Sequence, residues 1–464
     1  MALAFVAIPV AALAQRAGVL RAPDAPPWTS WAALGFFAIS YVLVILEERT
    51  HIRKSLPMII AAGVMWILAA IAPAPGDEAA EQLRENVIEF SELFLFILPA
   101  VTFVNTMEER QVFDALRVRL IRTGLSMRAL FWATGGLAFC MSPVADNLTT
   151  TLVMGAVAIS IGARSPAFVV PACINIVVAA NAGGAFSPFG DVTTLMVWQQ
   201  GKADFTDFFA LFLPSLVNWL VPAAIMSLAV PRGRPEVQAE RVELLPGALG
   251  VVALFLATIT WTVLLHQVLH LPAMLGMMLG LGVLYFYGHF LRRSLGRGHS
   301  VVLEEAPGIL GATGEAPRRD SFDVFGLLAR FEWDTLMFFY GVILCVGALH
   351  AFGMLDSAVL SLYAAWGSTA ANTVVGLASA VFDNIPLMAA ILTVSPEMGL
   401  DQWLLVTLTA GVGGSLLSVG SAAGVALMGQ ARGIYTFGAH LRWSWAVALG
   451  YAASVAVHVA INGA

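Results

Sequence analysis

The dipeptide Asp-Asn occurs twice in this chain, at Asp146–Asn147 and at Asp383–Asn384, and both copies lie in strongly apolar sequence. A carboxylate at membrane depth is costly unless it is hydrated, paired with another group or given a cation, so each aspartate is a candidate functional residue. One copy lies in each half of the chain. The pattern therefore indicates a single charged site built by a duplicated architecture.

A second polar interruption follows each Asp-Asn pair. The first, residues 181–194, reads Asn-Ala-Gly-Gly-Ala-Phe-Ser-Pro-Phe-Gly-Asp-Val-Thr-Thr, and the second, residues 411–424, is similarly dense in Gly and Ser. Gly, Pro and Ser at this density unwind a helix and free its backbone carbonyl groups. Within a membrane, such backbone is tolerated only where protein or a water-filled cavity surrounds it. The first interruption includes Ser187, which we take as a secondary site candidate.

These residue types favour a site for a small hard cation. Carboxylate, amide, hydroxyl and carbonyl oxygens together suit Na⁺ or Li⁺, and the carbonyl ends of interrupted helices add negative potential. Burial favours the protonated form of a carboxylate and a bound cation favours its ionised form, so one carboxylate holds either a proton or a cation but poorly both. That competition is itself an antiport mechanism. An anion site would instead need neutral donors or a fixed arginine, and no arginine lies inside these motifs.

The composition is that of a membrane protein. Of the 464 residues, 59% are hydrophobic and only 12% are charged, and the mean hydropathy is +0.82. Apolar runs of about 17–25 residues recur along nearly the whole chain, each long enough to span a bilayer core of roughly 30 Å. Most Lys and Arg residues fall in alternate loops, which the positive-inside rule assigns to the cytoplasm. The acidic loop 76–85, the segment 201–207 and the C-terminus are then expected outside.

This topology requires two apolar segments, residues 129–163 and 358–396, to enter and leave the membrane on the same side. Each carries one Asp-Asn pair, and we interpret both as re-entrant helical hairpins; the alternative is two ordinary spans in each. A broken transmembrane helix follows each hairpin, at about residues 166–200 and 402–430. Paired interrupted segments in two halves of a chain indicate a transporter binding site.

The predicted fold class is an all-α polytopic membrane protein with inverted structural repeats, each holding a re-entrant helical hairpin and a broken transmembrane helix. The first repeat covers residues 89–231 and the second covers 335–464. Residues 1–28 are expected to form a signal-like segment or a short first helix with a linker. N-terminal helices occupy 29–88, and residues 232–334 contain connecting helices and a cytoplasmic polar segment.

Several stretches carry a family resemblance. They read Asp146-Asn-Leu-Thr-Thr-Thr-Leu-Val-Met-Gly155, Cys173-Ile-Asn-Ile-Val-Val-Ala-Ala-Asn-Ala-Gly-Gly-Ala-Phe-Ser-Pro-Phe-Gly-Asp191 and Gly413-Gly-Ser-Leu-Leu-Ser-Val-Gly-Ser-Ala-Ala-Gly-Val-Ala426. Together with Phe331-Glu-Trp-Asp-Thr-Leu336 and Glu108-Glu-Arg-Gln111, they resemble NhaD-type sodium/proton antiporters, a family of the ion transporter superfamily. The resemblance runs from about residue 30 to the C-terminus.

The resemblance implies exchange of Na⁺, and also Li⁺, for H⁺ by alternating access, with sodium extrusion and pH homeostasis as the role. It also implies a homodimer, and we expect the chain in a bacterial inner membrane. The positions that match functional residues of the family are Asp146, Asn147, Asn181, Asp191, Thr193 and Thr194 in the first half, and Ser379, Asp383, Asn384, Ser418 and Ser421 in the second. Glu92 and Asp334 match acidic positions of the family with less defined roles.

Several of these residues also have structural explanations. Asp146 and Asp383 are suited to cap the second helix of each hairpin, and Asp191 suits the start of a resumed helix equally well. In the row Thr149–Thr151, hydroxyls can bond back to helix carbonyls or simply pack, and we keep Thr149 as a secondary candidate. The small residues at and between Gly276 and Gly280 favour close helix packing.

Two other functional classes were weighed against an antiporter. A cation-coupled carrier of arsenite or dicarboxylates would use the same architecture, although acidic hairpin tips disfavour it. An intramembrane aspartyl protease also uses two buried aspartates, but its G-x-G-D motif is absent because Asp191 follows Pro188-Phe189-Gly190. We therefore expect no enzymatic activity, no cofactor beside the transported Na⁺, Li⁺ and H⁺, and no partner except membrane lipid and a second copy of the chain. No histidine belongs to a motif, and His440, near a basic loop, is expected at the membrane interface.

Overall fold

The computed structural model describes residues 27–71, 76–162, 165–234, 242, 244–298, 333–418 and 420–463. The signal-like segment expected at residues 1–28 and most of the polar segment before residue 333 lie outside these residues. Every regular element in the described part of the chain is helical, which confirms the all-α class. Eight of the described helices are long and apolar enough to cross a bilayer, so the protein is an integral membrane protein.

The described residues divide into two compact units, and the division falls inside two helices, α5 (Gly76–Glu109) and α6 (Val112–Arg122). The larger unit takes the described residues of Met1–Leu93, Arg117–Glu240 and Trp333–Ala464, and the smaller takes those of Phe94–Leu116 and Arg241–Glu332. All candidate site residues named from the sequence fall in the larger unit.

The smaller unit is built around α12 (Ala248–Leu269) and α13 (Ala273–Gly298), which pack against each other. A Cβ atom added to Gly276 would lie 2.6 Å from Oγ1 of Thr262, so only glycine permits this approach. The packing role expected for the small residues of α13 is therefore confirmed. Phe103 of α5 stacks on Phe255 of α12 with ring centroids 5.0 Å apart.

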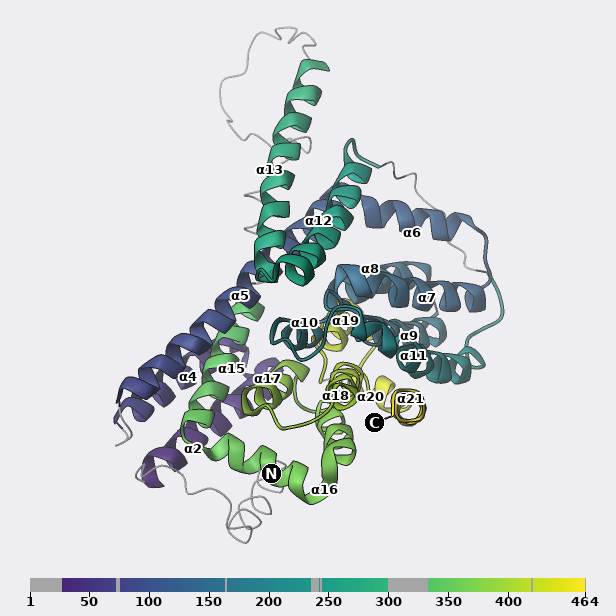
Figure 1. Cartoon of the computed structure of the whole chain (residues 1–464). Helices are drawn as coiled ribbons and strands as arrows, with labels where there is room; N and C mark the ends of the chain where they lie inside the picture. Colours follow the sequence, from purple (N-terminus) through teal and green to yellow (C-terminus); the bar gives the residue numbers. More distant parts are fainter. Residues whose placement is uncertain are drawn as a thin grey trace, which may run out of the picture. The chain divides into compact units, whose positions relative to one another are not determined.

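In the larger unit, the second long N-terminal helix, and to a lesser extent the first, packs against the helix that opens the second half. The N-terminal helices are α2 (Pro27–Ile45), α3 (Glu47–Thr50) and α4 (Ser55–Ile71), and α15 (Trp333–Ala351) lies along α4 (Figure 1). The indole Nε1 of Trp66 donates to the carbonyl of Leu344 at 2.9 Å and fixes this contact.

A first series of helices then carries the first Asp-Asn pair and the first interruption. It comprises α7 (Met127–Ala145), α8 (Asn147–Ile161), α9 (Pro166–Gly184), α10 (Val192–Gln199), the 3₁₀ helix η1 (Asp207–Leu211) and α11 (Phe212–Ser227). Asp146 separates α7 from α8 with a φ of 55°, and its side chain caps α8. The unwound residues 185–191 separate α9 from α10.

The second series repeats this order in the second half of the chain. It comprises α16 (Met354–Ala378), α17 (Asn384–Val394), α18 (Leu400–Gly413), α19 (Ala422–Gln430), α20 (Phe437–Leu441) and α21 (Ser444–Asn462). Asp383 caps α17, and the loop of residues 414–421 separates α18 from α19. Gly367 interrupts α16 with a φ of 73°, a conformation that favours glycine.

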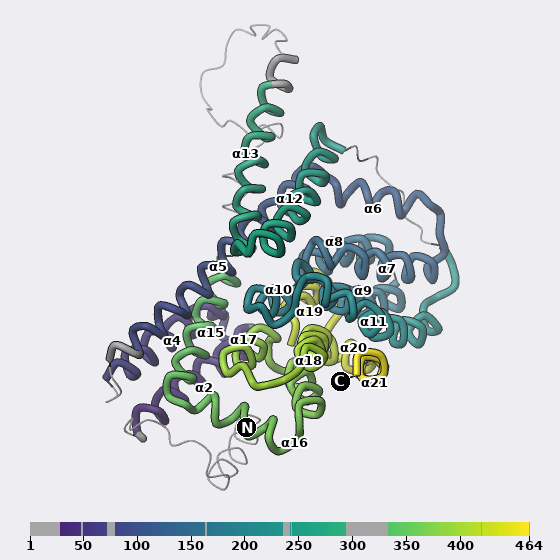
Figure 2. Tube along the Cα trace, viewed as in Figure 1, coloured from purple at the N-terminus to yellow at the C-terminus, as the bar shows by residue number. Residues whose placement is uncertain are grey.

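The two series pack against each other in a reciprocal pattern. Helix α8 of the first contacts α19 of the second, and α10 of the first contacts α17 of the second. Helix α9 likewise contacts α18, and α11 contacts α21. Figure 2 shows these neighbours as blue or teal tube beside green or yellow tube. Exchanging the two series leaves the set of contacts unchanged, and the starts of α8, α10, α17 and α19 carry the candidate residues.

Candidate functional site

Asp191, at the start of α10, is the centre of a buried hydrogen-bond cluster. Its Oδ1 accepts from the backbone N of Thr193 at 3.1 Å and so caps α10. Its Oδ2 accepts from Nδ2 of Asn147 at 2.8 Å and from Nδ2 of Asn384 at 3.0 Å. The capping explanation and the functional explanation therefore use different oxygens of one carboxylate. The asparagines of both Asp-Asn pairs meet at this group, although they lie in different halves of the chain.

Asn181, at the last turn of α9, extends the cluster into the loop 414–421. Its Oδ1 accepts from Asn147 at 3.1 Å, and its Nδ2 donates to Oγ of Ser415 at 2.8 Å and of Ser421 at 3.0 Å. Asn181 and Ser415 are fully buried. Asn147, Asn181, Asp191, Asn384 and Ser421 are thus brought together as one group. Ser415 belongs to it as well and was missed, although it lies inside the Gly413–Ala426 motif.

The two aspartates of the Asp-Asn pairs bond chiefly within their own helix starts. Asp146 accepts from the backbone N and from Oγ1 of Thr149, both at 2.8 Å. Asp383 accepts from the backbone N of Ile385 at 3.4 Å, and its own N–H donates to Tyr41 Oη at 3.2 Å. These bonds cap α8 and α17, so the cluster is centred on Asp191 and not on Asp146 or Asp383. Their role in cation binding stays a prediction.

Matched contacts hold the two helix pairs on the two interrupted helices. Ser142, four residues before Asp146, donates to the carbonyl of Ala180 at 2.6 Å. Ser379, four residues before Asp383, donates to the carbonyl of Ala410 at 2.9 Å. Both serines are fully buried. Ser379, expected to be functional, therefore lies next to the cluster as a support that ties α16 to α18.

Glycines permit the close approach on which these contacts depend. A Cβ at Gly183 would collide with the carbonyl of Phe139, and a Cβ at Gly413 would collide with the carbonyl of Gly376. Phe139 and Gly376 each stand seven residues before the aspartate of their Asp-Asn pair. The same local packing therefore occurs in both halves of the chain.

The first unwound loop is fixed by its own hydroxyl groups. Ser187 donates to the carbonyl of Pro143 at 2.8 Å. Thr194 donates to the carbonyls of Ser187 at 2.8 Å and Asp191 at 2.7 Å. Ser187 and Thr194 are therefore supports of the loop. The Oγ1 of Thr193 is different, since it is buried beside Asp191 and makes no well-formed hydrogen bond among the described residues.

The second unwound loop is fixed by residues beyond α19. Oγ of Ser418 lies 2.8 Å from Tyr435 Oη, which lies 2.8 Å from Nδ1 of His440. Nε2 of His440 lies 2.9 Å from the carbonyl of Ser415. His440 is fully buried, so its expected position at the membrane interface is wrong. Tyr435 and His440 were missed because they lie in a glycine- and arginine-containing stretch outside every motif.

Glu92 and Asp334 have surroundings different from those of the Asp191 cluster. Asp334, in the first turn of α15, accepts from Oγ of Ser55 at 2.5 Å and joins α15 to α4. Glu92 of α5 lines a cavity of about 510 Å³.

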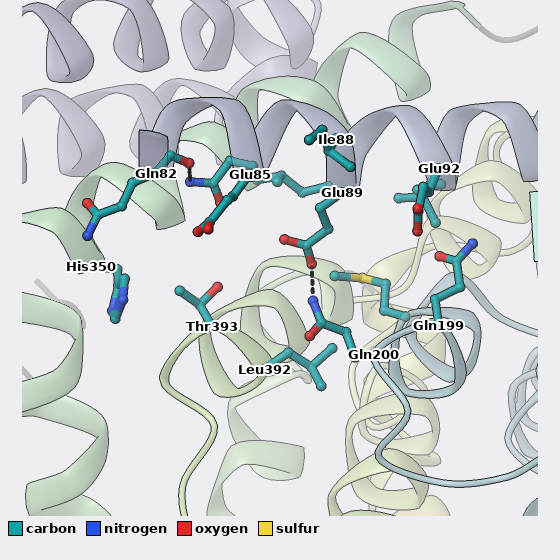
Figure 3. Close-up of a pocket in the computed structure, with 14 residues that line it drawn as sticks. Gln82, Glu85, Ile88, Glu89, Glu92, Gln199, Gln200, His350, Leu392 and Thr393 are labelled. Carbon is teal, nitrogen blue, oxygen red and sulfur yellow. Dashed lines mark hydrogen bonds between the residues drawn. The ribbon is translucent and has the colours of Figure 1, made fainter. Parts of the chain in front are cut away.

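This cavity combines acidic side chains with the far ends of two site helices. Glu85, Glu89 and Glu92 project from α5 into it, as Figure 3 shows. Glu89 accepts from Nε2 of Gln200, at the end of α10, at 2.7 Å. Thr393, in the last turn of α17, faces it as well. Because α10 and α17 are 8 and 11 residues long, they reach from the cluster to the cavity in about 12 and 16 Å.

The cluster offers the carboxylate of Asp191, three side-chain amides (Asn147, Asn181 and Asn384) and two serine hydroxyls (Ser415 and Ser421). Among the described residues, no group of three or more His, Cys, Asp or Glu is placed to hold a metal ion. A divalent or transition-metal site would favour such a group. A mixed set of carboxylate, amide and hydroxyl oxygens also suits a monovalent hard cation.

Known proteins match this chain over most of its length. A protein-family model described as citrate transporter matches residues 1–411. The Na(+)/H(+) antiporter NhaD of Alkalimonas amylolytica is 51% identical over 93% of this chain and 90% of that protein. The protein of the same name from Halomonas elongata is 50% identical over 97% of this chain and 92% of that protein. Sodium/proton antiporter 1 of Arabidopsis thaliana is 30% identical over 92% of this chain and 71% of that protein.

Proposed function

Because this chain belongs to the family of NhaD-type sodium/proton antiporters, we propose that it exchanges Na⁺ for H⁺ across the membrane, with Asp191 as the group that holds either ion. Li⁺ is a second substrate, since the same oxygens suit both small hard cations. The family is one of transporters, and the exchange needs no cofactor.

One observation carries the proposal. A single oxygen of Asp191 accepts hydrogen bonds from Asn147 and Asn384, which open helices from the two halves of the chain. A buried carboxylate is costly when it is ionised and unpartnered. Two amide N–H groups, a cation or a proton each relieve that cost, and the last two exclude each other. Once the site opens to each side of the membrane in turn, this competition couples the movements of the two ions.

The asparagine side chains allow the cluster to serve both states. An amide presents two N–H donors on one side and a carbonyl oxygen on the other. With their N–H groups towards Asp191, Asn147 and Asn384 stabilise its negative charge. Rotation of either amide presents its oxygen, so that Na⁺ would be held by Asp191, an amide oxygen and the hydroxyl of Thr193. Ser421 and Asn181 complete the oxygen set in this proposal.

The reciprocal packing supports an inverted repeat with alternating access. The contacts α8–α19 and α10–α17 exchange with each other when the two series are exchanged, and the supports at Ser142 and Ser379 match. In the proposed arrangement, α7–α8 and α16–α17 are re-entrant hairpins that enter from opposite faces. Rocking of the two pairs against the α9 and α18 region would open the cluster to each side in turn.

The acidic cavity is the proposed outer vestibule. Three carboxylates of α5 line it, together with the C-terminal ends of α10 and α17. Carboxylates and helix C-termini both attract cations. The predicted topology puts the loop 201–207 outside, so this cavity would face the exterior. Glu92 is then a vestibule residue and not a direct ligand of the transported cation.

The remaining expectations follow the same proposal. The protein would extrude Na⁺ and regulate internal pH from a bacterial plasma membrane, as a homodimer with its C-terminus outside. The NhaD relatives from bacteria support this location.

A cation-coupled anion carrier is the second candidate, favoured by the description of the matching family model. Citrate carries several negative charges and would need fixed cationic groups. Asp191 instead accepts hydrogen bonds from the side-chain amides of Asn147 and Asn384 and from the backbone N–H of Thr193. A central carboxylate would repel a carboxylate substrate, so the exchange of cations is the better account.

Everted membrane vesicles loaded with a pH-sensitive dye separate these candidates. Addition of Na⁺ or Li⁺ to vesicles with a preformed acid interior is expected to dissipate the proton gradient. The paired measurement is uptake of radiolabelled citrate driven by Na⁺, which is expected to stay at the level of empty-vector vesicles. Citrate uptake without cation-induced proton release would replace the antiporter proposal with the anion carrier.

A further inference from the structure

Two side chains outside the cluster hold the loop 414–421 at two points. His440 contacts the carbonyl of Ser415, and Tyr435 contacts the hydroxyl of Ser418, three residues further along. Tyr435 and His440 contact each other at 2.8 Å and so form one unit. All four residues are buried, with exposed fractions of 1% or less.

The carbonyl of Ser415 sets the direction of each hydrogen bond from His440 through Tyr435 to Ser418. A backbone carbonyl only accepts, so Nε2 of His440 carries the hydrogen and donates to Ser415. In the neutral imidazole, Nδ1 then accepts, and Tyr435 Oη donates to it. The hydroxyl of Ser418 must in turn donate to Tyr435 Oη.

The hydroxyl of Ser418 is thereby committed to Tyr435 and not to the Asp191 cluster. Ser418 has a φ of 63°, a left-handed conformation that is uncommon for a residue with a side chain. Gly424 makes space for the side chain of Ser418, because a Cβ atom at Gly424 would collide with the Ser418 hydroxyl. The contact with Tyr435 therefore fixes a strained turn in the middle of the loop.

The same loop presents two hydroxyls to the cluster on its other side. The hydroxyls of Ser415 and Ser421 accept hydrogen bonds from Nδ2 of Asn181 at 2.8 and 3.0 Å. The corresponding loop of the first half is held differently, by Ser187 on the carbonyl of Pro143 in its own helix pair. The second loop has Tyr435 and His440 in that role.

We propose that Tyr435 and His440 are positioning residues of the cation site, which hold the loop 414–421 so that Ser415 and Ser421 face Asn181. Ser418 is the anchor through which Tyr435 acts on the loop. The inference rests on the proposed exchange of Na⁺ for H⁺ and adds to it the residues that set the affinity for the cation.

The test compares two buried tyrosine hydroxyls in everted vesicles. Tyr435→Phe removes only the hydroxyl that joins Ser418 to His440. Tyr451→Phe is the matched control, because Tyr451 Oη donates to the carbonyl of Thr373 at 2.7 Å on α16, in a contact separate from the loop. Apparent KM for Na⁺ and the maximal exchange rate are measured for each at equal amounts of protein in the membrane.

Tyr435→Phe is expected to raise the apparent KM for Na⁺ about fivefold, the effect of losing one ordinary buried hydrogen bond, with little change in maximal rate. Tyr451→Phe is expected to leave the apparent KM at the wild-type value. His440→Leu is expected to raise the apparent KM at least as far, and His440→Gln to recover part of it, because an amide both donates and accepts. Combining Tyr435→Phe with His440→Leu is expected to give less than the product of the single effects.

A wild-type apparent KM in Tyr435→Phe, or an equal rise in Tyr451→Phe, would overturn the inference while wild-type exchange still upholds the proposed function. If the wild-type protein shows no Na⁺-dependent proton movement, the proposed function and the inference fall together. If Tyr435→Phe does not accumulate in the membrane, Ser418→Ala removes the same contact. Its apparent KM is expected to rise to the same extent, and an unchanged value contradicts the inference.

Discussion

Asn147 and Asn384 donate their side-chain amides to the same oxygen, Oδ2 of Asp191, at 2.8 and 3.0 Å. One opens α8 and the other opens α17, so the contact joins equivalent helix starts from the two halves of the chain. Any movement of one helix pair relative to the other must stretch or break one of these bonds. The ionisation of Asp191 and the relative position of the two pairs are therefore physically linked.

Replacing Asp191 removes the group that both ions require. We expect Asp191→Asn to abolish Na⁺-dependent proton movement in everted vesicles while the protein still inserts in the membrane. Asn retains N-cap capacity for α10, so the variant tests the charge and not the cap. Asp204→Asn, in the exposed loop before η1, is the matched control and should exchange normally. Substantial exchange by Asp191→Asn would remove Asp191 from the centre of the site.

The two amides should contribute separately to cation affinity. Asn147→Ala and Asn384→Ala each remove an amide whose oxygen is a proposed ligand of the cation. A hydrogen bond to a charged group is worth about 1.5–3 kcal/mol, and we take the same scale for this contact. We expect each to raise the apparent KM for Na⁺ by about tenfold or more, since 1.4 kcal/mol corresponds to a factor of ten. Saturation curves of exchange rate against Na⁺ concentration give these values. An unchanged apparent KM in either variant would assign that asparagine a purely structural role.

Asp146 and Asp383 can be tested apart from their caps. Asn and Asp are about equally good N-caps, so Asp146→Asn and Asp383→Asn keep the helix starts and remove only the charges. We expect both variants to lose most of their exchange activity while their thermal stability in detergent stays within a few degrees of wild type. Wild-type exchange rates in either variant would show that this aspartate is a helix cap only.

The matched glycines should be equally intolerant of a side chain. A Cβ at Gly183 would collide with the carbonyl of Phe139, and one at Gly413 would collide with the carbonyl of Gly376. Both obstacles are backbone atoms of packed helices, so relieving either collision requires a helix to shift. We expect Gly183→Ala and Gly413→Ala to lower the melting temperature in detergent by several degrees or to prevent accumulation. Gly429→Ala, where nothing lies within 4 Å, is the control and should be neutral or mildly stabilising. A melting temperature equal to that of the wild type in Gly183→Ala or Gly413→Ala would contradict this packing.

The interruptions of the helices were predictable because polar and helix-breaking residues stand out in apolar sequence. The separations at Asp146, Asp383 and the two unwound loops all follow from Asp-Asn pairs, Pro143 or runs of Gly and Ser. The membership of the cluster was largely predictable too, through Asn147, Asn181, Asp191, Asn384 and Ser421.

The centre of the cluster was not predictable from the sequence. Asp191 suits an N-cap as well as a ligand, and only the packing of α8 and α17 around α10 brings both amides to its second oxygen. The sequence does not identify Tyr435 and His440 as site residues, because the residues around them resemble an ordinary basic loop. No local pattern indicates that this stretch folds back on residues 415 and 418. Such contacts depend on tertiary packing between segments that have no shared motif.

Proton release on Na⁺ binding tests the competition at Asp191 most directly. Purified protein in weakly buffered detergent solution, at a pH where exchange is active, is mixed with Na⁺ and followed with a pH-sensitive dye. The account predicts acidification that saturates with Na⁺, needs a higher Na⁺ concentration as the pH falls, and is absent in Asp191→Asn. Wild-type protein that binds Na⁺ without releasing protons, or equal release from Asp191→Asn, would contradict it.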